Sequence, residues 1–62
     1  MKIIRISSFS GEINTMELPI TQAEIARWQA GELIQNVWPN LSTQQREFLM
    51  TGITAAEWEK FL

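Results

Sequence analysis

The sequence predicts an α+β fold in which an N-terminal antiparallel β-hairpin packs against three or four short helices. Three observations lead to this prediction. Two segments near the start alternate apolar and polar residues around a serine-rich turn, three capping-box patterns follow, and a glycine or proline comes after three of the predicted helices. With 62 residues, the chain is expected to form a single small domain over 1–62, with the hairpin in 2–18 and the helices in 20–62.

The hairpin is predicted from two strand-like segments that flank a turn. The first, residues 2–6, is rich in isoleucine, which favours strands, and places Ile4 and Ile6 on one face with Ile3 and Arg5 on the other. The turn sequence SSFSGE follows, and INTMEL then alternates apolar and polar residues. Because an isolated hairpin is marginal in water, we expect the rest of the chain to pack on one of its faces.

Helix starts are predicted from the capping box, in which a hydroxyl and a later Glu or Gln side chain each accept from an otherwise unpaired backbone N–H. The pattern occurs three times, as Thr21 with Glu24, Ser42 with Gln45, and Thr54 with Glu57. Gly31, Pro39 and Gly52 mark the helix ends. Helices are therefore predicted near 22–30, 32–38, 43–51 and 55–61, the second being short and open to continuing the first.

The core is predicted from apolar residues at helical spacing. These are Ile25 and Trp28, then Leu33, Ile34, Val37 and Trp38, and then Phe48 and Leu49. For Trp28 and Trp58 the spacing favours core packing. Trp38 precedes Pro39 at a helix end, where a large ring is harder to bury, so core packing and partner binding are both open interpretations. Trp38, Pro39 and Arg46 are accordingly the predicted partner-binding residues.

Catalysis is disfavoured by composition, because the chain contains no histidine, cysteine, aspartate or tyrosine. Glu57 and Glu59 are two residues apart on a predicted helix, so they point in different directions and are interpreted as solvent-facing. The three glycines are isolated and form no phosphate-binding loop. We therefore expect no enzyme activity, no catalytic residue, no cofactor, no metal site and no small-molecule substrate.

Nucleic-acid binding is the alternative function, because two helices joined by a short turn can form a helix-turn-helix. Gln44, Gln45 and Arg46 begin a predicted helix with side chains that could address bases and phosphates. The net charge of −2 disfavours this function, since phosphate neutralisation normally supplies much of the affinity. In the competing structural interpretation Gln45 completes a cap and Arg46 faces solvent. Mimicry of DNA is also disfavoured, because the glutamates are scattered along the sequence.

Membrane insertion is not predicted. No stretch approaches the roughly 20 apolar residues of a membrane-spanning helix, and the opening MKIIRI is interrupted by Arg5 and turns polar at Ser7, unlike a signal peptide. We expect a cytoplasmic protein that binds another protein or itself.

From Ile20 onward the sequence resembles small uncharacterised proteins encoded by bacteriophages, including small single-stranded-DNA phages. The likeness covers about two-thirds of the chain and is carried by Trp28, Gly31, Gln35, Pro39, Leu41, Arg46, Glu47, Phe48, Gly52, Ile53, Glu57 and Trp58. No activity or catalytic residue comes with it. The resemblance implies a phage accessory protein that binds or inhibits a host or viral protein. A non-enzymatic protein-interaction module is therefore the leading functional hypothesis.

Overall fold

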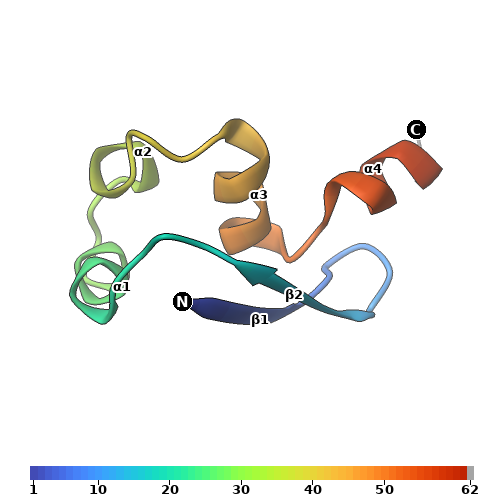
Figure 1. The fold of residues 1–62 in the computed structure, drawn as a ribbon, viewed down its shortest axis with the longest axis horizontal. Coiled ribbons are helices and arrows are strands. Elements are labelled where there is room, and N and C mark those ends of the chain that lie inside the picture. Colours follow the sequence, from blue (N-terminus) through green and yellow to red (C-terminus); the bar gives the residue numbers. More distant parts are fainter. Residues whose placement is uncertain (62) are drawn as a thin grey trace.

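The structure, a computed structural model, describes residues 1–61 and contains within them a two-stranded sheet followed by four short helices. The strands are β1 (Lys2–Ile6) and β2 (Ile13–Glu17), and the helices are α1 (Gln22–Gln29), α2 (Ile34–Val37), α3 (Thr43–Thr51) and α4 (Ala55–Phe61). The predicted α+β class is confirmed. In Figure 1, α3 lies over the hairpin, while α1 and α2 lie toward one end of it and α4 toward the other.

The hairpin has two faces of different character, because successive side chains of a strand point in opposite directions. One face, which we call the covered face, is half-buried and consists of Ile3, Arg5, Asn14 and Met16. The other is exposed and is called the open face; it consists of Lys2, Ile4, Ile6, Ile13, Thr15 and Glu17. Across the strands Lys2 is paired with Glu17, Ile4 with Thr15, and Ile6 with Ile13.

The turn between the strands is organised by Ser7, whose side chain is buried although it is polar. Its Oγ accepts hydrogen bonds from the backbone N–H groups of Phe9 and Ser10, both at 3.2 Å. Its own N–H donates to the Glu12 carbonyl at 2.8 Å. The buried hydroxyl oxygen and the N–H of Ser7 are thus paired within the turn, as buried polar groups generally must be.

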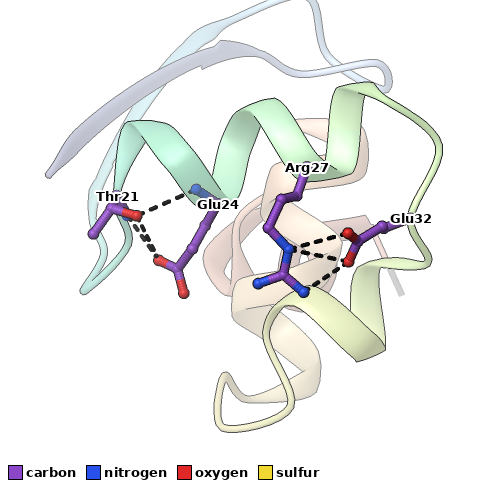
Figure 2. A network of polar contacts seen from close by, with 4 residues as sticks. All are labelled: Thr21, Glu24, Arg27 and Glu32. Carbon is purple, nitrogen blue, oxygen red and sulfur yellow. Dashed lines mark hydrogen bonds and ion pairs between the residues drawn. The ribbon is translucent and has the colours of Figure 1, made fainter.

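All three predicted capping boxes form. At the start of α1, Thr21 Oγ1 accepts from the Glu24 N–H at 3.2 Å, and Glu24 Oε1 accepts from the Thr21 N–H at 2.8 Å (Figure 2). Ser42 and Gln45 form the same pair of bonds at 3.1 and 2.9 Å before α3. Thr54 and Glu57 form it before α4, with both bonds at 3.3 Å. Each box pairs two backbone N–H donors that a helix start would otherwise leave free.

The second helix is shorter than predicted and separate from the first. The sequence predicts a helix over 32–38, but only Ile34–Val37 is helical. At the end of α1 the Gly31 and Glu32 N–H groups turn back to the Trp28 and Arg27 carbonyls at 3.0 and 3.2 Å. Gly31 has φ of 111°, outside the helical region, so the chain turns here and α2 cannot continue α1.

The core lies between the helices and the covered face of the hairpin. Its buried apolar members are Leu18, Ile20, Val37, Trp38, Leu41, Phe48 and Leu49, and Phe48 has no exposed surface. Trp38 is the most buried tryptophan, at 3% exposure, whereas Trp28 and Trp58 are half-buried. Trp28 packs on the core with its ring 5.5 Å from that of Trp38 in an edge-to-face arrangement, a favourable geometry for aromatic pairs.

The C-terminal end of α3 is joined directly to the hairpin backbone. The Ser8 N–H donates to the Thr51 carbonyl at 2.9 Å, and Asn14 Nδ2 donates to the Gly52 carbonyl at 2.9 Å. Gly52 ends the helix with φ of 75°, as predicted for a glycine cap. The last carbonyls of α3 are therefore paired by the turn and by β2, which fixes the hairpin under the helix.

Candidate functional site

The predicted partner-binding residues do not form one exposed surface. Trp38 is buried in the core at 3% exposure, Pro39 beside it is exposed, and Arg46 is half-buried on α3. The Trp38 ring is buried because α2 ends at this residue, where φ and ψ of −128° and 67° leave the helix and Leu41 folds back onto the core. Core packing therefore describes the position of Trp38, and only Pro39 of the three is freely accessible to a partner.

A small hollow lies next to Trp38. It has a volume of about 130 Å³ and is lined by Pro19, Glu24 and residues 37–41. Ligand pockets of proteins are usually larger, about 300–1,000 Å³. Within the described residues, Trp38 Nε1 is a buried side-chain donor without a hydrogen-bond partner, but it is closed off from solvent and so is not offered to a molecule in the hollow. The hollow does not make a convincing small-molecule site.

The residues of the nucleic-acid alternative are largely occupied by the fold. Gln45 completes the capping box with Ser42, as the structural interpretation of the sequence predicted. Arg46 is half-buried, whereas Gln44 is exposed. Of these three residues, Gln44 alone is exposed, and its side chain makes no hydrogen bond to the described residues. One neutral amide would contribute little to DNA affinity.

Glu57 is the most highly connected charged side chain of the described residues, and its interpretation as solvent-facing is wrong. It is only 8% exposed, whereas Glu59 on the same helix is exposed. Glu57 Oε2 accepts from Ser10 Oγ, and Oε1 accepts from Asn14 Nδ2 and from the Thr54 N–H. The carboxylate therefore links α4 to the hairpin turn and to β2.

The charge of Glu57 is maintained by these contacts. The hydrogen bond from Ser10 lowers the pKa of the Glu57 carboxyl below its ordinary value of 4.5, and the bonds from Thr54, Asn14 and Ser7 act in the same direction. Burial opposes them by favouring the neutral form. Both carboxylate oxygens are used as acceptors, so Glu57 holds the structure together and is not placed to act as a general base.

An ion pair between Arg27 and Glu32 lies at the other end of the molecule from Glu57. Arg27 at the end of α1 binds Glu32 through two nitrogens, with Nη2 2.7 Å from Oε2 and Nε 3.1 Å from Oε1 (Figure 2). This hydrogen bonding lowers the pKa of Glu32 and raises that of Arg27. Both side chains are about half exposed, where ion pairs contribute little to stability. The pair closes the turn between α1 and α2, and a phosphate would have to displace Glu32 to bind Arg27.

The open face of the hairpin carries three of the six large apolar side chains that remain exposed among the described residues. Ile4 is 60% exposed, Ile6 is 64% exposed and Ile13 is 71% exposed. Ile6 and Ile13 are directly paired across the strands, and Ile4 lies two residues along β1 on the same face, so the three side chains are contiguous. The half-buried covered face, with Ile3 and Met16 packed against the core, lies on the other side of the hairpin. Contiguous exposed apolar residues of this kind indicate an interaction surface.

Sequence reasoning identified the two faces of the hairpin but did not select the open face as a site. The alternation along β1 indicates that one face of the hairpin stays open, but it does not indicate whether that is the face of Ile4 and Ile6. Phe9 in the connecting turn is also 58% exposed and lies at the Ile6 and Ile13 end of the hairpin.

Two further kinds of site find no support in the described part of the chain. Across residues 1–61 there is no group of three or more His, Cys, Asp or Glu side chains that could hold a metal ion. None of the helices in this range is long and apolar enough to cross a membrane. Comparison with protein-family models, with curated proteins and with solved structures yields no match.

Proposed function

We propose that this chain is a small non-enzymatic protein-interaction module that binds a protein through the open face of its hairpin. The observation that supports the proposal is the contiguous set of exposed isoleucines, Ile4, Ile6 and Ile13. Covering these side chains would remove apolar surface from water, which is the main favourable contribution to protein association. The resemblance to bacteriophage proteins supports an accessory role in which the module binds or inhibits a host or viral protein in the bacterial cytoplasm.

The open face also has the form expected of a recognition surface. Its apolar residues are at the turn end of the hairpin, and Lys2 and Glu17 lie exposed at the other end. Apolar contacts provide affinity, while charged groups at the edge of an interface set orientation and partner choice. Paired strand positions carry both sets of side chains, so the backbone of this surface is already ordered before binding.

The proposal is tested by capture of proteins from a bacterial lysate on the immobilised chain, followed by mass spectrometry. The double variant Ile4→Thr and Ile13→Thr removes apolar surface from the open face while keeping β-branched residues that favour strands. The matched control is Leu33→Thr, which alters a side chain of similar exposure, 58%, in the turn before α2.

A protein retained by the wild type and by Leu33→Thr but lost by the double variant would support the open face as the binding surface. A folded double variant that retains every partner of the wild type would refute this surface. Circular dichroism and the unfolding midpoint establish that each variant is folded before capture is compared.

A further inference from the structure

The side chains of the open face are arranged in three cross-strand rows of different chemistry. Lys2 and Glu17 form a charged row at one end, Ile4 and Thr15 form a mixed row in the middle, and Ile6 and Ile13 form an apolar row at the turn end. All six side chains are exposed. Any partner that covers the open face must therefore provide a negative and a positive charge side by side at one end and apolar groups at the other.

We propose that a second copy of this chain covers the open face, packed sheet on sheet about a two-fold axis parallel to the strands. This inference rests on the proposed function, because it uses the same surface, for which a second copy and a bacterial protein would compete. A two-fold axis in this direction places β1 of each copy over β2 of the other without reversing the direction along the strands. Each cross-strand row of one copy therefore lies over the same row of the other copy, with the β1 residue of one opposite the β2 residue of the other.

The register makes this arrangement complementary in charge and in apolar character. Lys2 of each copy lies opposite Glu17 of the other, and Ile6 lies opposite Ile13. The two charged pairs are related by the symmetry and occur together. Stacked sheets are about 10 Å apart and their strands are nearly aligned, a distance that a lysine and a glutamate side chain can span together.

The other symmetric arrangements fit the open face less well. A two-fold axis in the plane of the sheet but perpendicular to the strands would reverse the rows and place Lys2 opposite Ile6 and Glu17 opposite Ile13. Each charge would then be covered by an apolar side chain without a partner, which is unfavourable. A two-fold axis normal to the sheet would join strand edges and leave Ile4, Ile6 and Ile13 exposed.

The carboxylate of Glu17 is able to take part in this pairing. Its Oε1 binds the N-terminal ammonium of Met1 at 3.1 Å, and the side chain is still 76% exposed. A lysine of the second copy can approach the remaining oxygen, because a carboxylate accepts several hydrogen bonds. Met1 also donates to the Leu18 carbonyl at 2.6 Å, so the start of β1 is held in place independently of the second copy.

The interface is small. A five-residue strand is about 17 Å long and adjacent strands are about 4.8 Å apart, so a two-stranded face provides less than the roughly 800 Å² per partner of a stable complex. The dimer is therefore weak and in exchange with the monomer. Association is measured by sedimentation equilibrium and by concentration-dependent amide shifts, from about 10 μM to about 1 mM, a range chosen for weak complexes.

The test reverses one charge of the charged row at a time. Lys2→Glu makes the charged row entirely acidic, and Glu17→Lys makes it entirely basic, so each variant alone opposes like charges across the axis. Each is expected to dimerise at least tenfold more weakly than the wild type. An equimolar mixture of the two variants restores opposite charges on both sides of the axis and is expected to associate as strongly as the wild type or better. Ile13→Thr is expected to weaken the dimer without altering the charged row.

A wild type that stays monomeric up to about 1 mM would overturn the dimer. So would variants that dimerise like the wild type, or a mixture that associates no better than its separate components. If the wild type is monomeric but the Ile4→Thr and Ile13→Thr variant still loses a captured bacterial protein, the dimer is refuted and the proposed function stands. If neither association nor capture depends on the open face, both fail.

Discussion

The α-carbon of Gly52 lies against the backbone of Ile6, where the end of α3 meets the end of β1. A β-carbon at Gly52 would lie 2.5 Å from the Ile6 carbonyl oxygen and 2.8 Å from the Ile6 carbonyl carbon. The clash is with backbone, so it cannot be relieved by rotation of a side chain. Gly52 also has φ of 75°, which a residue with a β-carbon rarely adopts.

The first prediction is that Gly52→Ala strongly destabilises the domain. The left-handed backbone alone costs about 1–2 kcal/mol for alanine, and the clash adds the cost of separating α3 from the hairpin. Gly11→Ala is the matched control, because Gly11 has nearly the same φ, 77°, and nothing within 4 Å of its β-carbon position. Urea unfolding should show a clearly greater loss of the free energy of unfolding for Gly52→Ala than for Gly11→Ala. Equal losses would mean that the approach to Ile6 has no energetic consequence.

The second prediction concerns acid. The hydrogen bonds of Glu57 lower its pKa in the folded state, so its stabilising contribution is present above the unfolded pKa, ordinarily 4.5, and is lost as pH falls through the folded value. The wild type should therefore lose more stability than Glu57→Gln between about pH 6 and pH 3. Urea unfolding at several pH values measures the free energy of unfolding of both proteins. The Arg27–Glu32 pair is present in both, so its titration does not contribute to the difference.

Glu59→Gln is the control for loss of one negative charge from the same helix, because Glu59 is exposed while Glu57 is buried. It should keep the acid sensitivity of the wild type. Hydrogen exchange adds a local measurement. Because Glu57 joins α4 to Ser10 and Asn14, the substitution Glu57→Gln should accelerate amide exchange relative to the wild type more in α4 than in α3. Uniform acceleration of both helices would contradict a local role for Glu57.

The elements of this fold are predictable from sequence because their signals are local. A capping box spans four residues, and each of the three, including Thr54 with Glu57, forms in the structure. Isoleucine-rich and alternating segments likewise define both strands, which occupy Lys2–Ile6 and Ile13–Glu17. The boundary of α2 was less accurate, since a four-residue helix depends on tertiary contacts more than on its own sequence.

The arrangement of the elements was not predictable in the same way, because it depends on residues far apart in the sequence. Alternation along β1 separates Ile4 and Ile6 from Ile3 and Arg5, but does not indicate which pair the helices cover. The Glu57 contact with Ser10 spans 47 residues and leaves no pattern in either segment. Both the open face and the role of Glu57 therefore emerged only from the folded chain.

The third prediction is that Trp38→Ala unfolds the domain. The sequence left core packing and partner binding open for Trp38, and its 3% exposure and its ring contact with Trp28 favour packing. Truncation of a buried aromatic residue costs about 3–5 kcal/mol, which is comparable to the total stability of a small domain. Circular dichroism at 25 °C should show an unfolded spectrum. A folded Trp38→Ala variant that has lost a protein partner would instead favour the partner-binding interpretation.

The fourth prediction uses the unpaired nitrogen of the same ring. Trp38 Nε1 is buried without a hydrogen-bond partner among residues 1–61, which costs about 1–3 kcal/mol relative to a paired donor. Trp38→Phe removes this donor as well as part of the ring, so the two effects oppose each other. The free energy of unfolding should change by no more than about 1 kcal/mol. A loss clearly above about 1 kcal/mol would contradict the prediction that removal of the Nε1 donor offsets the lost packing.

The fifth prediction separates the structural from the nucleic-acid interpretation of α3. Gln45→Ala removes the side chain that accepts from the Ser42 N–H, so it should lower the free energy of unfolding by about 0.5–1 kcal/mol. Gln44→Ala, at an exposed neighbouring position, should change it by less than about 0.5 kcal/mol.

If the helix instead reads DNA, both variants should weaken binding of a labelled duplex, and that binding should fall steeply with added salt. With a net charge of −2 and Arg27 held by Glu32, we expect no duplex binding even at low salt. The two glutamine variants should then differ in the free energy of unfolding alone, because Gln45 accepts from the Ser42 N–H at the start of α3 and Gln44 does not.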